Sequence, residues 1–157
     1  MVKGLSKLKG AIKLRGEVTV RVFDAETMKL LQTVTVKNLV VNVGLQETLD
    51  KMFNLEPGAA FTYCAVGSED TAVAEGQTAL SNELARSDFD ECSRSGQVVT
   101  VDTWFGSSEG NGTWKESGLF NAASAGTMLS RALFDPPITK DVTKIVQVEW
   151  TITASHS

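Results

Sequence analysis

Two stretches of alternating β-branched residues near the start of the chain constrain its fold more than any other feature. Residues 17–23 read EVTVRVF, with three valines on one face, and residues 30–42 continue in the same style, rich in valine and threonine. A period of two is typical of a half-buried strand. The polar segment 24–29 between them predicts a turn that the Asp24 side chain caps. Together the two stretches predict a β-hairpin.

The rest of the chain carries further strand patterns between turn signals. A buried strand is expected at 61–67, and residues 68–86 form a long polar stretch that predicts a loop with one helical turn at 79–84. The remaining strand candidates cover residues 87–91, 97–106, 113–121, 127–135 and 144–153. Short strands at this spacing predict a mainly β fold, a β-sandwich or partly closed β-barrel of about eight short strands.

One helix is predicted at 43–53, with Asn42 as its N-cap. Its apolar residues repeat at i, i+4, i+7 and i+8, which defines a single stripe along the helix. The members of this stripe are Leu45, Leu49, Met52 and Phe53. We expect the helix to bury the stripe against the sheet, so that Leu49→Ala should cost ~2–5 kcal/mol of stability.

The first sixteen residues differ in charge from the rest of the chain. Residues 1–15 hold five cations and no acid, whereas the remaining ten basic and nineteen acidic residues give a net charge of −9. This predicts a basic N-terminal arm (1–16) on a single β-rich domain (17–157). Either the arm reaches onto a partner, or it is a solvated tail. The candidate partner-binding residues are Lys3, Leu5, Lys7, Leu8, Lys9, Ile12, Lys13 and Arg15.

Residues suited to catalysis or metal binding are few. The only histidine, His156, is penultimate, where a frayed end gives no fixed imidazole for Ser–His or Cys–His chemistry. Cys64 and Cys92 lie far apart and are expected to be free and buried. The glycine-rich segment 106–112 lacks a phosphate-loop pattern and predicts a hairpin loop. We therefore expect no enzyme activity, no cofactor and no metal.

The three tryptophans allow a sugar-binding alternative. Trp104 and Trp150 lie in alternating apolar segments and are expected in the core. Trp114 follows a turn and is the one expected to be exposed, which would suit a partner interface or a carbohydrate-binding module. The cations of the arm suit phosphate contacts, but the body has no further basic cluster, so sequence-specific nucleic-acid binding is not expected.

Several short motifs also follow one another along the chain in an order that resembles that of a known protein family. They are Gly44-Leu45, Gly67, Thr78-Ala79-Leu80 with Glu83 and Arg86, Glu116 with Gly118-Leu119-Phe120-Asn121, Arg131, Ile138-Thr139-Lys140 and Trp150. From about Val18 to Ala154, this order resembles small virion proteins of tailed bacteriophages, including tail-fibre and collar-fibre modules. The chain departs from that pattern at GSED, where a glycine- and threonine-rich run is more usual, and at Met28, where a glycine is common.

The resemblance implies a structural role. First, it implies a capsid decoration (cement) protein, a homotrimer at lattice junctions whose arm staples the major capsid protein. The alternative is a tail, neck or fibre-base component of the same virion. Since no apolar run has the length of a signal peptide or membrane helix, we expect synthesis in a cytoplasm and no membrane partner. The resemblance implies that this is the host cytoplasm and that the protein resides in the virion. Glu83, Arg86, Glu116 and Arg131 are candidates for ion pairs that link segments.

Overall fold

The computed structural model describes residues 10–55 and 58–156, and in these ranges the chain forms nine antiparallel strands and one helix. The elements are β1 (Ile12–Asp24), β2 (Leu30–Val40), α1 (Asn42–Phe53), β3 (Tyr63–Gly67), β4 (Glu83–Asp88), β5 (Glu91–Ser95), β6 (Val98–Phe105), β7 (Gly112–Phe120), β8 (Met128–Lys140) and β9 (Lys144–His156). The predicted mainly β class with one helix is confirmed. The strands number nine where about eight were expected, and β1, β8 and β9 have 13 residues each.

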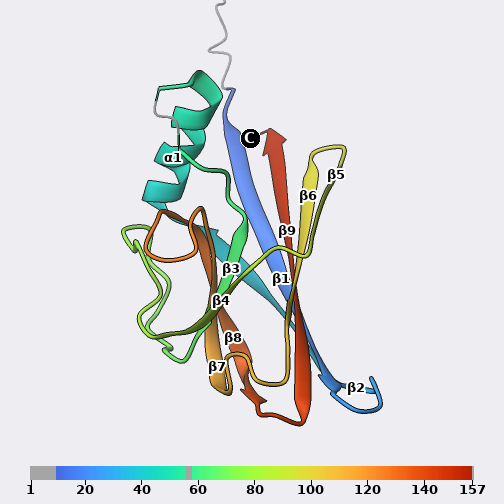
Figure 1. Cartoon of the computed structure of the whole chain (residues 1–157). Coiled ribbons are helices and arrows are strands. Elements are labelled where there is room, and N and C mark those ends of the chain that lie inside the picture. The colour runs from blue at the N-terminus through green and yellow to red at the C-terminus, as the bar shows by residue number, and fades with distance from the viewer. Residues whose placement is uncertain (1–9, 56–57, 157) are drawn as a thin grey trace, which may run out of the picture.

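The strands form one curled sheet in the order β4-β3-β7-β8-β2-β1-β9-β6-β5. Strand β2 connects the two halves of the curled sheet, because its first part pairs with β1 and residues 38–40 pair with β8. Figure 1 shows the resulting half-barrel, with β1, β9 and β6 facing β8, β7 and β3. The core lies between these layers and is built from fully buried side chains such as Val18, Val20, Trp114 and Trp150.

The predicted β1–β2 hairpin is confirmed, including the role of Asp24. One carboxylate oxygen of Asp24 accepts hydrogen bonds from the backbone N–H of Thr27 at 2.8 Å, from the Thr27 hydroxyl at 2.9 Å and from the Glu26 N–H at 3.1 Å. The bonds from Thr27, the backbone bond first, lower the pKa of Asp24 because they favour the charged carboxylate.

Strand β1 begins before the predicted domain boundary. Its first residues pair with the end of β9, so that Ile12 lies opposite His156 and Gly16 opposite Ile152. The expected arm of residues 1–16 is therefore wrong for residues 12–16, and Ile12, Lys13 and Arg15 belong to the sheet. The physical reason is the length of β9, which supplies hydrogen-bonding partners up to its last residue. The remaining arm residues, Lys3, Leu5, Lys7, Leu8 and Lys9, lie outside the described part of the chain.

Three local predictions are wrong. Residues 83–88 form β4 instead of continuing a helical turn. Segment 106–112 is a loop, but it crosses between the two layers, because β6 and β7 are not neighbours in the sheet. Strand β8 runs through Pro136 and Pro137 to Lys140, although the strand was expected to end at residue 135. Each error concerns strand partners distant in sequence, which local patterns do not specify.

A buried ion pair fastens the long 68–82 segment to the sheet. Arg131 Nε lies 2.8 Å from Glu116 Oε2, and both side chains are fully buried. The Glu116 carboxylate also accepts the backbone N–H groups of Ser81 and Asn82, while Arg131 donates to the carbonyl of Thr71. The pair therefore ties the segment at both of its ends to β7 and β8.

A second pair, also expected from the motifs, lies nearer the surface. Arg86 on β4 contacts Glu83 at 2.7 Å and donates to the carbonyls of Ala122 and Ala125. Its guanidinium stacks over the Phe120 ring at 3.7 Å from the ring centroid. Arg86 thus joins the β4 edge to the turn between β7 and β8.

Candidate interaction surface

The residues considered above for nucleophilic chemistry lie on different strands in the described part of the chain, with Cys64 on β3, Cys92 on β5 and His156 on β9. No group of three or more His, Cys, Asp or Glu residues within it is placed to hold a metal ion. Cys64 and Cys92 are free, as predicted, but Cys92 is exposed where a buried thiol was expected. Burial raises the pKa of the Cys64 thiol to about 11, so this thiol is protonated at neutral pH and a poor nucleophile. His156 is the last residue of β9, paired with Ile12, so the expected frayed position is wrong.

Trp104 and Trp114 exchange their predicted positions. Trp114 is fully buried, which contradicts its expected exposure. Its indole N–H donates to the carbonyl of Gly110 at 2.6 Å, and its ring meets Phe105 edge-on at 5.1 Å. Trp150 is buried as predicted, whereas Trp104 is only partly buried and packs beside Phe23 at 5.5 Å. The alternation within each strand explains this, because Val101, Thr103 and Phe105 take the inward positions of β6.

Helix α1 presents its apolar stripe to solvent, contrary to prediction. The exposed fractions are 41% for Leu45, 53% for Leu49, 59% for Met52 and 67% for Phe53. The expected cap is also wrong, because the N-cap residue is Val41 and Asn42 is the first helical residue. The predicted large effect of Leu49→Ala therefore has no structural basis in a single copy of the chain.

The opposite side of α1 faces the body. Gly44 is buried there, and a Cβ at this position would collide with the backbone of Leu129 on β8. Farther along the same side, Glu47 pairs with Lys51 and accepts a hydrogen bond from the Asn121 amide at 3.2 Å. The Lys51 ammonium lies 5.2 Å from the centre of the Phe61 ring. A close glycine contact and a polar pair thus set the rotation of the helix, which leaves the leucines outward.

An apolar groove lies between the exposed side of α1 and the ends of β1 and β9. It encloses about 430 Å³ and is almost wholly apolar, with Thr48 as its one hydroxyl-bearing residue. Its walls are Ile12 and Leu14 of β1, Ala154 of β9, and Leu45, Thr48, Leu49 and Met52 of α1. We call this set of residues the α1 groove. Figure 1 shows α1 beside the start of β1 and the end of β9, near the C-terminus.

The groove extends the inner face of the sheet beyond the core. Ile12 and Leu14 lie an even number of residues before Val18, so they belong to the same face of β1. That face is buried from Val18 onward along the strand. A second apolar hollow of about 280 Å³, lined in part by Phe61, Phe89 and Ile152, lies between the layers. The α1 end of the half-barrel is therefore apolar but incompletely filled.

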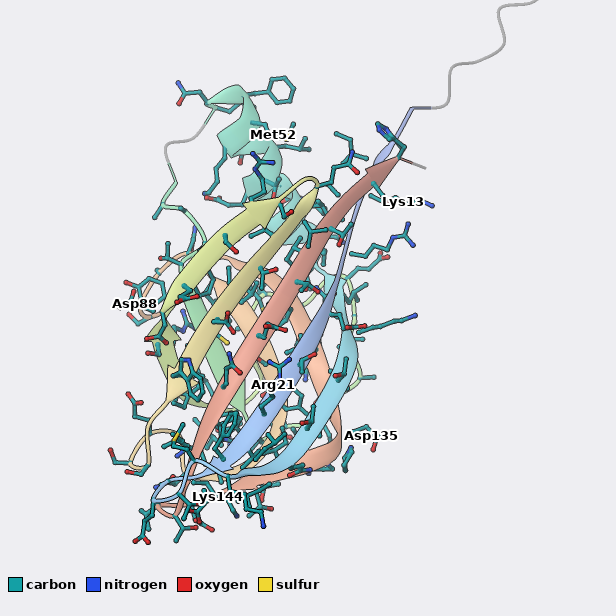
Figure 2. All side chains as sticks on the ribbon, turned by 90° about the vertical axis from the view of Figure 1, so that its right-hand side faces the viewer. Lys13, Arg21, Met52, Asp88, Asp135 and Lys144 are labelled. Carbon is teal, nitrogen blue, oxygen red and sulfur yellow. The ribbon has the colours of Figure 1, made fainter. Side chains whose placement is uncertain are left out.

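The opposite end carries a smaller exposed apolar set, which we call the hairpin tip. Met28 in the β1–β2 turn and Leu30 and Leu31 at the start of β2 are about half exposed, and Val142 of the β8–β9 turn is 65% exposed. The two turns are joined by a hydrogen bond from the Ala25 N–H to the Thr143 carbonyl at 2.8 Å. Figure 2 shows Met52 and Lys144 at opposite ends of the molecule, which separates the α1 groove from the hairpin tip.

Polar side chains occupy the outer face of β1, β9 and β6 between these ends. Arg21, central in Figure 2, contacts Gln147 at 3.2 Å and Glu149 at 3.5 Å, and Gln147 donates to Asp102 at 2.8 Å. Burial and the nearby Glu149 carboxylate raise the pKa of Asp102. These groups satisfy one another, so the outer face is a hydrogen-bonded polar surface between two apolar ends.

The pattern that defines the groove was visible in the sequence, but its direction was not. Helical periodicity identified the stripe of α1, whereas the contact of Gly44 with β8 and the Glu47–Lys51 pair, which set the side that packs inward, appear only in the structure. No helix in the described ranges combines the length and apolarity that crossing a membrane requires. No family model matches the chain, and neither a curated protein nor a solved structure matches it.

Proposed function

We propose that this protein is a virion structural protein of a tailed bacteriophage, and specifically a capsid decoration protein that binds the lattice of the major capsid protein. The observation that carries the proposal is the exposed apolar surface of α1 and its groove. Burying one such side chain fully is worth ~1.5–3 kcal/mol, so a contiguous exposed set of them is typical of a surface that binds a protein.

The separation of the two apolar ends supports a linking role. A decoration protein needs one contact to its neighbours and another to the shell, and the α1 groove and the hairpin tip provide two distinct surfaces. The charge contrast between the first 15 residues and the acidic remainder adds an electrostatic component to such contacts. We assign the basic arm and the α1 end together to contacts with neighbouring subunits.

The mechanism is thermodynamic linkage. A protein that binds the assembled lattice but not its separated subunits stabilises the assembly by mass action. Closed rotational symmetry, as in the homotrimer implied by the resemblance, would let each copy use the same pair of surfaces. The layered core and the buried Arg131–Glu116 pair supply a body that is already folded before it binds.

A tail, neck or fibre-base position in the same virion is the second candidate, because it would use the same two surfaces. The carbohydrate-binding alternative loses its proposed contact residue, since Trp114 is buried. Copy number separates the two virion positions. Mass spectrometry of purified particles should find hundreds of copies per particle on a capsid surface, against about a dozen or fewer at a neck or tail.

Binding to particles tests the proposal directly. Purified protein should co-sediment with undecorated shells, and it should raise the temperature at which those shells break open. Binding only to isolated tails would move the protein to the second position. Absence from purified virions, together with no binding to shells or tails, would contradict the proposal as a whole.

A further inference from the structure

The α1 groove has the size and chemistry to hold a short apolar segment. Its volume of about 430 Å³ lies within the ~300–1,000 Å³ typical of preformed binding pockets. Leu49, Met52 and Ile12 are each more than half exposed along its rim. An occupant with two or three aliphatic side chains would complete the apolar layer that Val18 and Val20 begin.

The chain has such a segment directly before β1. Nine residues precede Gly10, and they contain Leu5 and Leu8, which repeat with Ile12 at i, i+3 and i+7. Ile12 itself forms part of the groove wall. The described chain therefore starts at the edge of the groove, and nine residues can reach up to ~30 Å when extended.

Charge also favours contact between copies. Residues 1–9 contain Lys3, Lys7 and Lys9 and no acidic residue, whereas the chain after residue 15 has a net charge of −9. A cationic segment of one copy and the acidic body of another attract each other, and this attraction weakens as salt is added.

The pairing of β1 indicates whether the segment before it reaches the groove of its own copy or that of a second copy. Because Ile12 already pairs with His156, the backbone enters the sheet along the strand axis. Leu8 would reach its own groove only if the chain reversed within residues 9–11. We infer that the groove binds the Leu5–Leu8 segment of a second copy, so that copies join by exchanging arms; this inference rests on the proposed assembly function and names its partner.

Sedimentation velocity over a range of concentrations tests the exchange with four proteins. They are the intact chain, the arm variant Leu5→Ser/Leu8→Ser, the groove variant Leu49→Ser/Met52→Ser, and the control variant Met28→Ser/Leu31→Ser at the hairpin tip. The intact protein and the control should associate equally. The arm and groove variants should each associate at least tenfold more weakly, with unfolding midpoints close to that of the control.

The decisive experiment mixes the arm variant with the groove variant. An arm variant retains an intact groove and a groove variant retains an intact arm, so a labelled mixture should form mixed pairs that neither variant forms alone. A synthetic peptide of residues 1–11, added in excess, should dissociate the intact oligomer. This measurement uses no variant, so it does not depend on how well the variants fold. No mixed association would overturn the exchange, as would an intact protein that stays monomeric at every concentration.

The outcome is separable from that of the proposed function. A monomeric protein that still binds undecorated shells would overturn arm exchange and leave decoration in place. An arm-exchanged oligomer that binds neither shells nor tails would overturn decoration and leave the exchange in place.

Discussion

The centre of the half-barrel and its α1 end differ in how completely they bury the same kind of side chain. On β1, Val18 and Val20 are fully buried, whereas Ile12 on the same face is 69% exposed. The strand pattern is continuous between them, so the difference comes from what lies opposite. Strands of the second layer cover the valines, while α1 stands beside Ile12 with a groove between them.

This comparison separates residues that hold the fold from residues available for binding. The central layer is complete in one copy and should account for most of the unfolding free energy. The α1 end is incomplete, so its side chains should contribute little to folding and much to association.

The buried pair at the centre should show the largest effect. Glu116→Leu leaves the Arg131 guanidinium buried without its partner, which should cost about 3–5 kcal/mol in unfolding free energy. The double variant Glu116→Leu/Arg131→Met should lose less than the single variant. Asp70→Asn, which breaks the exposed pair with Lys115, is the control and should have little effect. Equal losses for Glu116→Leu and Asp70→Asn in denaturant unfolding would contradict the buried pair.

Gly44→Ala tests the contact that orients α1. The added methyl group would collide with the Leu129 backbone, and overpacking of this kind costs about 1–3 kcal/mol. Gly76→Ala, at a position with nothing within 4 Å of the added Cβ, is the matched control and should have little effect. A fully tolerated Gly44→Ala would mean that the helix does not pack through this face.

Leu49→Ala should have a modest effect on the isolated chain. Since Leu49 is 53% exposed, only part of the ~1.5–3 kcal/mol available from full burial can be lost. We expect about 1 kcal/mol at concentrations where the protein is monomeric. A loss above 3 kcal/mol under those conditions would show that the stripe packs inward.

The substitution Asp141→Asn should have the smallest effect on stability, and this effect should depend on pH. Hydrogen bonds from the Thr143 side chain and backbone, together with Lys144, lower the pKa of Asp141 to about 2. Its stabilising contribution is therefore complete above the unfolded pKa of about 3.9 and is lost as pH falls through about 2. Asp141→Asn should lower stability at neutral pH, and the difference from the intact protein should vanish in strong acid. A difference that persists unchanged below pH 2 would contradict this cause.

The sequence predicted those parts of the fold that local patterns determine. Alternating valines specified the β1–β2 hairpin, and Asp24 specified its turn. Trp114 could have been placed inside by the alternation of Thr113, Trp114 and Lys115, but the nearby glycines suggested an exposed turn. The Gly110 carbonyl, which satisfies the buried indole, becomes visible only in the structure.

The candidate site was predicted as a set of residues but not as a surface. Periodicity shows that Leu45, Leu49 and Met52 share a side of the helix, yet it does not show what that side faces. The groove also needs Ile12, which joins it because β9 extends to His156 and pairs with the start of β1. That pairing links residues at the two ends of the chain, beyond the reach of any local pattern.

Oxidation of the methionines shows whether the α1 end is covered in the assembled protein. In one copy Met52 and Met28 are 59% and 51% exposed, while Met128 is fully buried and serves as the internal control. Mass spectrometry after mild peroxide treatment should find Met52 and Met28 oxidised at similar rates in dilute protein. At concentrations where copies associate, Met52 should become several-fold slower while Met28 is unchanged. Equal oxidation of Met52 and Met28 at every concentration would contradict the covering of the α1 end by a second copy.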